Sequence, residues 1–292
     1  MRLKMFAGLE RTFRRFKKRR RLAAAQTELT ARIANGSQWQ SSPHGLDRRL
    51  VVSLTSYPTR FATLKPTLQS LLFQTTRPDA TVLWIAHDEL ELLPPDIRDL
   101  ERSGLEIRVC ENLRSYKKLL PALEAWPDAI IVTADDDVYY WPQWLEELVN
   151  TYRKTGDPVI CQRAHKIRLG ADGLPRPYLE WRRRVEAHQR GPLIFPTGVT
   201  GVLYDPRIFH EDIARRDLIA ELCPHADDVW LYWMHRMKGS QPHLISDGRK
   251  NVEWPESQVQ SLRSINVDQN LNDRQIEAMI AHYGFPEPRE AE

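Results

Sequence analysis

The stretch Ala129-Ile130-Ile131-Val132-Thr133-Ala134 is followed directly by three carboxylates, Asp135-Asp136-Asp137. The first run is apolar or β-branched at every position, which is typical of a strand buried on both faces of a parallel sheet. The carboxylates then lie at the carboxyl edge of that sheet, where open α/β folds bind ligands. Three adjacent carboxylates repel one another, so we expect Asp135 and Asp137 to converge on a hard divalent cation. Capping of the following helix, or solvated acid, is the alternative.

Similar apolar runs recur on both sides of this stretch, with helical patterns between them. Strands are expected at 50–54, 81–86, 105–109 and 129–134, and helices at 61–72, 96–102 and from about 116. Apolar strands that alternate with helices predict βαβ units and a mostly parallel sheet with helices on both faces. Beyond residue 140 the pattern is mixed, with strands expected at 159–163, 201–204 and 242–246 and helices at 144–154, 226–237 and 272–283.

The first 21 residues differ in charge from the rest of the chain. They hold ten Lys and Arg residues and one acidic residue, so their net charge is +9. The whole chain has a net charge of +3, so the remaining residues sum to −6. Five apolar residues recur there at helical spacing: Leu3, Phe6, Leu9, Phe13 and Phe16. A basic amphipathic helix of this kind is typical of one that lies in an anionic membrane surface. A solvated tail, or a nucleic-acid or targeting arm, is the alternative, although the acidic remainder gives no reason to expect nucleic acid.

Composition excludes several classes of protein. With 41% hydrophobic and 28% charged residues the chain is of ordinary globular type. No run of eighteen apolar residues occurs, so no membrane span is expected, and no signal-peptide core follows the early charges. Cys110, Cys161 and Cys223 are widely spaced and form no CxxC pair, which argues against a disulfide framework and a zinc site. We therefore expect a cytoplasmic protein, peripheral at the inner face of the cell membrane.

The strand that ends in Thr133-Ala134-Asp135-Asp136-Asp137-Val138-Tyr139 resembles the DxD signature of GT-A glycosyltransferases, and the chain is similar to family 2-like bacterial members of that group. The resemblance extends over 49–247: residues 51–60 are similar to the first strand and nucleobase loop, and 68–75 to the helix that follows. It implies a Rossmann-like GT-A fold and transfer of a sugar from a nucleotide-diphosphate donor, a UDP-sugar first, assisted by Mn²⁺ or Mg²⁺. The acceptor would be a glycan or lipid-linked hydroxyl in bacterial surface polysaccharide assembly.

Three segments follow from these patterns. Residues 1–48 are expected to form the basic helix and, from residue 23, a linker. Residues 49–247 form the GT-A catalytic domain, with a nucleotide-binding half over about 49–140 and an acceptor half over about 141–247. Residues 248–292 form a C-terminal helical extension.

Several side chains are expected to contact the donor. The resemblance implies a base contact from Asp88, with Glu89 as an acidic neighbour, and a glycine turn at Gly198 and Gly201 beside the donor sugar. Lys117 is the first candidate for a diphosphate contact, followed by Lys118 and Arg114. These cations lie before a helix, where the helix dipole disfavours positive charge and a bound diphosphate would offset it. The donor residues expected are Thr55, Tyr57, Arg60, Asp88, Lys117, Asp135, Asp136, Gly198 and Gly201. The metal ligands expected are Asp137, Asp135 and His243.

A second acidic pair, Asp227-Asp228, opens the helix expected at 226–237. Carboxylates in the first turn are stabilised by the helix dipole, so capping alone would account for them. The resemblance implies instead that Asp228 is the general base and Asp227 its neighbour. A carboxylate in that role would take the proton from the acceptor hydroxyl, and the anomeric configuration would invert.

Two other functions remain open from the sequence. A metal-dependent sugar nucleotidyltransferase also uses acids at a parallel sheet edge, but no Gly-rich basic loop follows the first strand, only Thr55-Ser56-Tyr57-Pro58. A non-catalytic membrane-associated adaptor that binds a nucleotide or glycan would depend on residues 1–21 and tolerate loss of Asp137.

Overall fold

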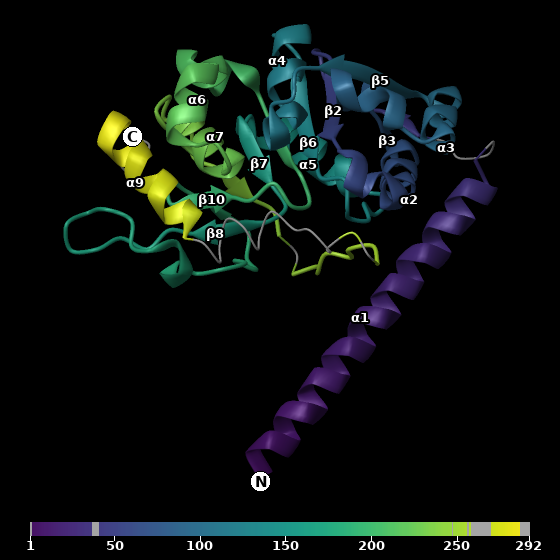
Figure 1. Cartoon of the computed structure of the whole chain (residues 1–292), viewed down its shortest axis with the longest axis horizontal. Coiled ribbons are helices and arrows are strands. Elements are labelled where there is room, and N and C mark those ends of the chain that lie inside the picture. The colour runs from purple at the N-terminus through teal and green to yellow at the C-terminus, as the bar shows by residue number, and fades with distance from the viewer. Residues whose placement is uncertain (1, 37–40, 247, 256, 258–269, 287–292) are drawn as a thin grey trace.

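The computed structural model describes residues 2–36, 41–246, 248–255, 257 and 270–286. These residues form an eight-stranded sheet with helices on both faces (Figure 1). The order across the sheet is β5 (Leu105–Cys110), β4 (Ala80–Ala86), β2 (Leu50–Thr55), β6 (Ile130–Ala134), β11 (Val202–Tyr204), β7 (Val159–Cys161), β12 (His243–Leu244) and β9 (Gln189–Arg190). The expected α/β fold with a mostly parallel central sheet is confirmed.

Strand direction decides which ends meet at one edge. The strands β5, β4, β2 and β6 pair in parallel, with Ser53 opposite Thr133 and Leu54 opposite Ala134. Strand β11 runs antiparallel between β6 and β7, so β7 again points the same way as β6. The residues that follow β2, β4, β6 and β7 therefore gather at one edge of the sheet.

The core has two layers because strand residues alternate between faces. On β2, Leu50, Val52 and Leu54 pack on one side, with α2 (Phe61–Leu72), α3 (Pro95–Arg98) and α5 (Trp144–Thr155). Val51 faces the other side, which is covered by α4 (Leu120–Ala125), α6 (Arg216–Leu222), α7 (Asp227–Arg236) and α9 (Leu271–Tyr283). Burial on both faces explains why these strands are apolar at every position.

Short elements complete the described part of the chain. Two small sheets pair β1 (Ser42–Pro43) with β3 (Thr76–Arg77) and β8 (Ala164–Lys166) with β10 (Ile194–Pro196). The 3₁₀ turns are η1 (Pro58–Arg60), η2 (His87–Leu92), η3 (Asp99–Ser103), η4 (Arg114–Lys118), η5 (Tyr178–Glu180), η6 (Pro206–Ile208) and η7 (Glu211–Ala214). The helix expected from about residue 116 thus begins with the 3₁₀ turn η4. The last helix begins at Leu271, one residue earlier than expected, with Asn270 at its N-cap position.

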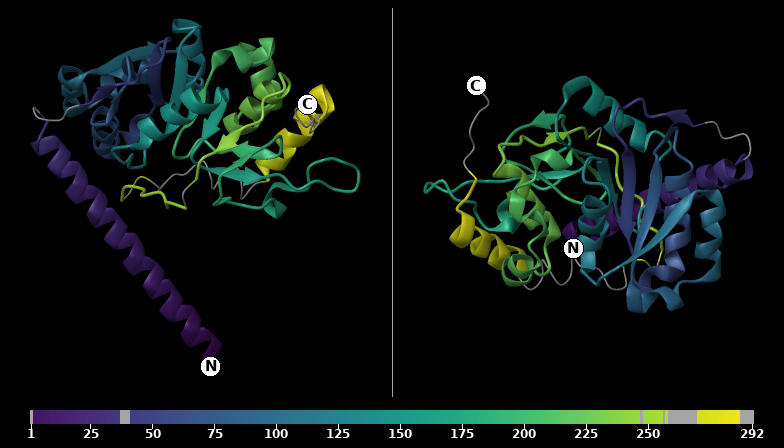
Figure 2. Two further views of the ribbon diagram at one scale, coloured as in Figure 1. Left: turned by 180° about the vertical axis from the view of Figure 1, so that it is seen from behind. Right: turned by 90° about the horizontal axis from the view of Figure 1, so that it is seen from above.

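Helix α1 (Arg2–Ala34) extends away from the body, with the N-terminus far from the sheet (Figures 1 and 2). The linker expected from residue 23 is wrong in its first part, because the helix continues to Ala34. Ala25 and Leu29 are buried against Tyr139 and Trp254, and this packing stabilises the extra turns. No helix among the described residues combines the length and apolar character needed to cross a bilayer.

Arg32 anchors the base of α1 to the body. Its guanidinium donates to the carbonyl of Phe73 at 2.6 Å, the hydroxyl of Tyr139 at 2.7 Å and the carbonyl of Tyr140 at 3.1 Å. The Tyr139 hydroxyl in turn donates to Glu28 at 2.6 Å. The fixed part of α1 therefore contacts the loop that follows Asp137.

Candidate active site

The three carboxylates after β6 each have a separate partner. Asp136 accepts a hydrogen bond of 2.6 Å from the hydroxyl of Ser56, which follows β2. Asp137 pairs with Arg60 Nη1 at 2.6 Å, and Arg60 also lies 3.5 Å from Asp136. Asp135 pairs with Lys118 Nζ at 3.2 Å. The parallel pairing of β2 with β6 brings these groups to one edge of the sheet.

Burial and charge shift the titration of this cluster. Burial raises the pKa of Asp136 to about 7, and the repulsion from Asp137 and Asp135 adds to the effect. Arg60 and the Ser56 hydroxyl act in the opposite direction. Burial alone would lower the pKa of Arg60, but Asp136 and Asp137 outweigh it and hold that pKa above its ordinary value. Arg60 is therefore a fixed cation beside two of the three carboxylates.

The acidic pair at the start of α7 faces the same edge. Asp227 lies 2.9 Å from Lys118 Nζ, and Asp228 Oδ1 accepts a hydrogen bond of 2.9 Å from the backbone N–H of Gly198. The N-cap of α7 is Ala226, and no side chain caps this helix. Neither carboxylate makes a capping hydrogen bond, although both lie in the first turn, where the helix dipole stabilises them. Both turn toward the residues that follow β6.

Lys118 joins the two acidic groups. Its ammonium lies between Asp135 and Asp227. Burial alone would lower the pKa of Lys118. The attraction of Asp135, Asp227 and Asp228 outweighs burial and raises that pKa well above its usual value. From the sequence, Lys117 was expected to contact the donor, ahead of Lys118. In the structure Lys117 Nζ instead pairs with Glu89 at 3.0 Å and donates to the Ser56 carbonyl at 3.3 Å.

The surroundings of Asp228 change its pKa. Burial raises the pKa of Asp228 to about 7, with a further contribution from Asp227, while Lys118 and the Gly198 N–H act in the opposite direction. A carboxylate with a pKa near the working pH can both accept and release a proton efficiently. Its pKa therefore suits proton transfer better than that of an ordinary exposed aspartate.

The two glycines expected beside the donor have different roles. A Cβ on Gly198 would lie 2.6 Å from Lys118 Nζ and 3.2 Å from Asp228 Oδ1, so the backbone must approach these groups without a side chain. Gly201, at φ +93°, faces the Trp144 ring, which a Cβ would meet at 2.5 Å. Gly201 therefore shapes the turn and packs against the core, and only Gly198 borders the site.

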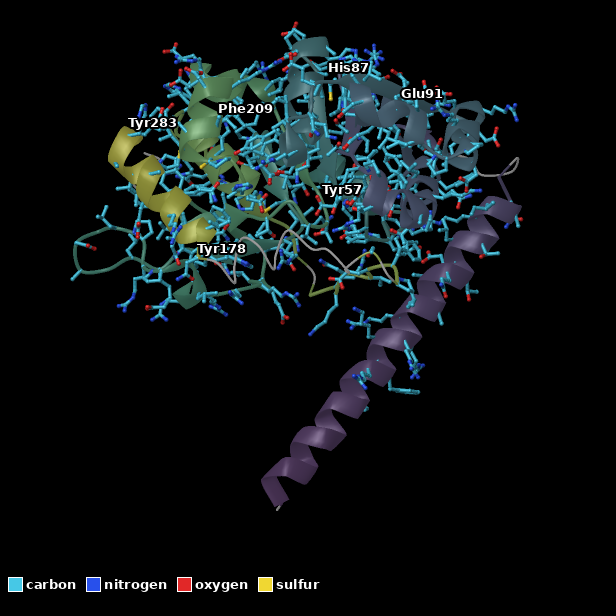
Figure 3. The ribbon with its side chains drawn as sticks, viewed as in Figure 1. Tyr57, His87, Glu91, Tyr178, Phe209 and Tyr283 are labelled. Atoms are coloured by element: carbon cyan, nitrogen blue, oxygen red, sulfur yellow. The ribbon has the colours of Figure 1, made fainter. Side chains whose placement is uncertain are left out.

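Other expected donor residues lie around the edge. The Thr55 hydroxyl donates to the Trp84 carbonyl at 2.8 Å, and the Tyr57 hydroxyl accepts from Arg60 Nε at 3.3 Å. Figure 3 shows Tyr57 near the middle of the body, with His87 and Glu91 at its upper rim. Asp88, in the same turn η2, is exposed, and its neighbour Glu89 makes the contact with Lys117. The acidic side chain of this turn that joins the contacts of the site is thus Glu89.

His243 does not belong to the site. Its Nδ1 lies 2.8 Å from Asp157 Oδ2, and Asp157 precedes β7. Since β7 runs parallel to β6, the residues before it lie at the edge opposite Asp135. The expectation that His243 supplies a metal ligand is therefore wrong.

The remaining metal ligands expected, Asp135 and Asp137, are of the type that a hard divalent cation prefers, but two carboxylates are too few to hold it alone. Carboxylate oxygens are the ligands that Mg²⁺ and Mn²⁺ prefer. Among the described residues, however, no three His, Cys, Asp or Glu side chains converge as a metal site. Asp135 and Asp137 could contribute to an ion whose other ligands come from a bound diphosphate, as is usual for Mg²⁺ at phosphate-binding sites.

Two further residues at this edge were not among those expected from the sequence. Ser56 is an ordinary serine in a turn, yet it donates to Asp136. Arg163 follows the buried strand β7, and its Nη1 donates at 2.6 Å to the hydroxyl of Thr197, the residue before Gly198. The useful signal for both was their place directly after a buried strand that points to the same edge.

Comparison with known proteins gives matches in structure and none in sequence. Neither a family model nor a curated protein sequence matches the chain. Residues 1–349 of TarS from S. aureus superpose with a TM-score of 0.44 at 14% identity, covering 80% of this chain and 72% of that one. The UDP complex of the same fragment has a TM-score of 0.43 at 13% identity, covering 70% and 59%. Whole TarS has a TM-score of 0.43 at 14% identity, covering 70% and 36%.

Proposed function

We propose that this chain is a glycosyltransferase that moves a sugar from a nucleoside diphosphate donor to an acceptor hydroxyl. One observation carries the proposal. Carboxylates from the end of β6 and from the start of α7 meet around Lys118, with the Gly198 backbone between Lys118 and Asp228. An acidic edge beside a carboxylate of raised pKa would provide one group for a cation at the leaving diphosphate and another for the attacking hydroxyl.

Asp228 is the general base in this proposal. Its Oδ1 is held by the Gly198 N–H, which leaves Oδ2 to take the proton from the acceptor hydroxyl. The acceptor oxygen then forms its bond to the anomeric carbon as the bond between that carbon and the diphosphate oxygen breaks. Direct displacement of this kind inverts the anomeric configuration. Asp227 and Lys118 fix the environment of the base through their ion pair.

Asp135 and Asp137 would hold a Mn²⁺ or Mg²⁺ ion together with the diphosphate. Such an ion supplies positive charge to the leaving group. In the structure Arg60 already pairs with Asp137, so binding of an ion there requires Arg60 to release or share that carboxylate. In that arrangement Arg60 would contact a phosphate oxygen.

The nucleotide belongs to the opposite side of the cluster from Asp228. Ser56 and Tyr57 follow β2, Glu89 lies in the turn η2 after β4, and Lys117 lies in η4. These side chains contact one another or the Asp136–Asp137 side. A UDP-sugar is the first donor to test, because UDP-sugars are the usual substrates implied by a DxD motif.

The basic part of α1 is proposed to bind an anionic membrane surface, which would make this a peripheral enzyme at the cytoplasmic face. Phe13 and Phe16 are exposed on α1, with the cations of Lys17 and Arg20 over their rings. The side chains of Leu3, Phe6 and Leu9, on the same expected face, lie outside those that the structure describes. A lipid-linked or glycan acceptor for a bacterial surface polysaccharide would be met at this location.

Isothermal titration of the full chain with UDP, GDP and CDP, with and without Mn²⁺, tests the proposal. We expect one nucleotide to bind in a metal-dependent manner, Asp137→Ala to lose that binding, and the exposed-site control Asp128→Ala to keep it. Failure of all three nucleotides to bind would remove the donor site and favour a non-catalytic adaptor.

A further inference from the structure

A pocket on the acceptor side of the site carries an excess of positive charge. It is lined by the segments that follow β7 and β12 and by residues 184–186. The charged side chains at its wall are Arg163, Arg184, Glu186, Arg249 and Lys250. Four cations thus face one carboxylate in a hollow of the surface.

The cations differ in how well they are neutralised. Arg249 is engaged by Glu147 at 3.5 Å and stacks 4.1 Å from the Trp141 ring. For Arg163, Arg184 and Lys250, the described part of the chain offers no carboxylate within 4 Å of the charged group. Three of the four cations therefore have no partner of opposite charge among the described residues.

Arg163 is the most unusual of them. Its Nε is buried and lacks a hydrogen-bond partner, and its Nη1 donates only to the neutral hydroxyl of Thr197. Burial, followed by repulsion from Arg184, lowers the pKa of Arg163. Arg163 is half-buried, and a buried guanidinium N–H without a partner is costly, because its lost hydration is not replaced. An anion bound in the pocket would supply the missing partner.

The contacts of Arg163 place this pocket beside Asp228 and away from the nucleotide half. Arg163 donates to Thr197, and the next residue, Gly198, donates to Asp228. Ser56 and Lys117, by contrast, connect to Asp136 and Glu89. The hydrogen bonds that start at Arg163 therefore lead to Asp228, the proposed base. The acceptor lies beside that base.

We infer that Arg163, Arg184 and Lys250 form a subsite for a phosphate or carboxylate group of the acceptor, so that the acceptor is an anionic glycan or glycolipid. The inference rests on the proposed function, since it names the chemistry of the second substrate. Guanidinium groups bind phosphate and carboxylate through paired, charge-assisted hydrogen bonds, which suits the unused Nε of Arg163.

Inorganic phosphate is the probe for this subsite. The full chain is first saturated with the nucleotide that binds it and with Mg²⁺, and phosphate is then titrated by calorimetry. We expect phosphate to bind alongside the nucleotide. Arg163→Gln should weaken phosphate binding by at least about tenfold, the scale of one charge-assisted contact. Arg163→Lys should retain part of the affinity, and the exposed neighbour control Arg182→Gln all of it.

A pair of acceptor analogues separates the acceptor from the donor as the source of the anion. A methyl glycoside and its 6-phosphate are compared by saturation-transfer NMR with the nucleotide present. Wild type should prefer the phosphorylated glycoside, and Arg163→Gln should lose the preference. Thermal unfolding of each variant verifies that it is folded.

The possible failures are distinguishable. Phosphate that displaces the nucleotide would assign the pocket to the donor diphosphate and overturn the inference. Absence of phosphate binding, or equal binding to Arg163→Gln, would overturn it while leaving nucleotide binding and the proposed function intact. Loss of nucleotide binding with phosphate still bound through Arg163 would remove the proposed function and the acceptor assignment together, leaving an anion site of another kind.

Discussion

Asp228 Oδ1 accepts a 2.9 Å hydrogen bond from the backbone N–H of Gly198, 30 residues earlier in the chain. A Cβ at position 198 would lie 3.2 Å from that oxygen and 2.6 Å from Lys118 Nζ. The contact therefore depends on glycine at this position. Gly198→Ala should displace Lys118 and the base, with a loss of turnover of about 10²-fold, as expected for a misplacement of about 1 Å. Steady-state kinetics and a thermal melt measure this, and normal turnover would show that the approach is not required.

Asp228→Asn should lower kcat by about 10²–10⁴-fold, the usual contribution of a general base, and leave nucleotide affinity unchanged. The pKa of Asp228 is raised to about 7, and the base acts in its deprotonated form. Turnover of the wild type should therefore fall as the pH drops below about 7 and level off above it. A pH–rate profile from pH 5.5 to 8.5 measures this limb. If the same limb persists in Asp228→Asn, another residue is the base.

Lys118→Gln should move the acid limb of the pH–rate profile to higher pH. Lys118 lowers the pKa of Asp228, so loss of its charge leaves the buried carboxylates less compensated and raises that pKa further. Lys117→Gln is the matched control, because Lys117 pairs with Glu89 and not with Asp227. Equal shifts in the two variants would contradict the central position of Lys118.

Removal of residues 1–21 should abolish binding to vesicles of anionic lipid and leave nucleotide binding unchanged. The deleted part carries +9, whereas Leu29 and Arg32, which fix α1 to the body, remain. In the full chain, replacing Phe13 and Phe16 together by Ser should weaken vesicle binding, and Leu92→Ser, an exposed apolar site on the body, should not. Co-sedimentation measures binding. Equal binding of the truncated chain would mean that the arm does not mediate it.

Asp205→Asn should destabilise the fold by roughly 3 kcal/mol at pH 7 without touching the site. The Asp205 carboxylate is buried and accepts hydrogen bonds from Arg48 at 2.7 Å, Arg207 at 2.6 Å and Tyr152 at 2.9 Å. Burial raises the pKa of Asp205, but these bonds outweigh it and hold the pKa below its ordinary value.

A lowered pKa adds stability above the unfolded-state pKa of about 4, and that stability is lost as the pH falls below it. The difference between wild type and Asp205→Asn should therefore narrow as the pH drops below about 4. Urea unfolding at pH 7 and at about pH 3 measures both values, with the exposed Asp172→Asn as control. A constant difference between the two would contradict the ionic account of Asp205.

Much of the site was predictable because it depends on strand direction. Asp135-Asp136-Asp137 follow a buried parallel strand, and any such residue lies at the carboxyl edge of the sheet. The direction that each side chain takes in a turn was not predictable. Lys117 and Lys118 are adjacent in η4, yet only Lys118 reaches Asp135 and Asp227. Likewise Glu89, and not Asp88, turns inward to Lys117.

The sequence by itself determined the fold class and the two acidic segments, because apolar periodicity and the order of the strands along the chain can be read without knowing how the elements pack. Only the tertiary structure decided the partners. It places His243 at the opposite edge beside Asp157, extends α1 to Ala34 through contacts with Tyr139, and leaves the Nε of Arg163 buried without a partner. Each of these depends on groups distant in the chain. Burial and charge act through space, so no local pattern could reveal them.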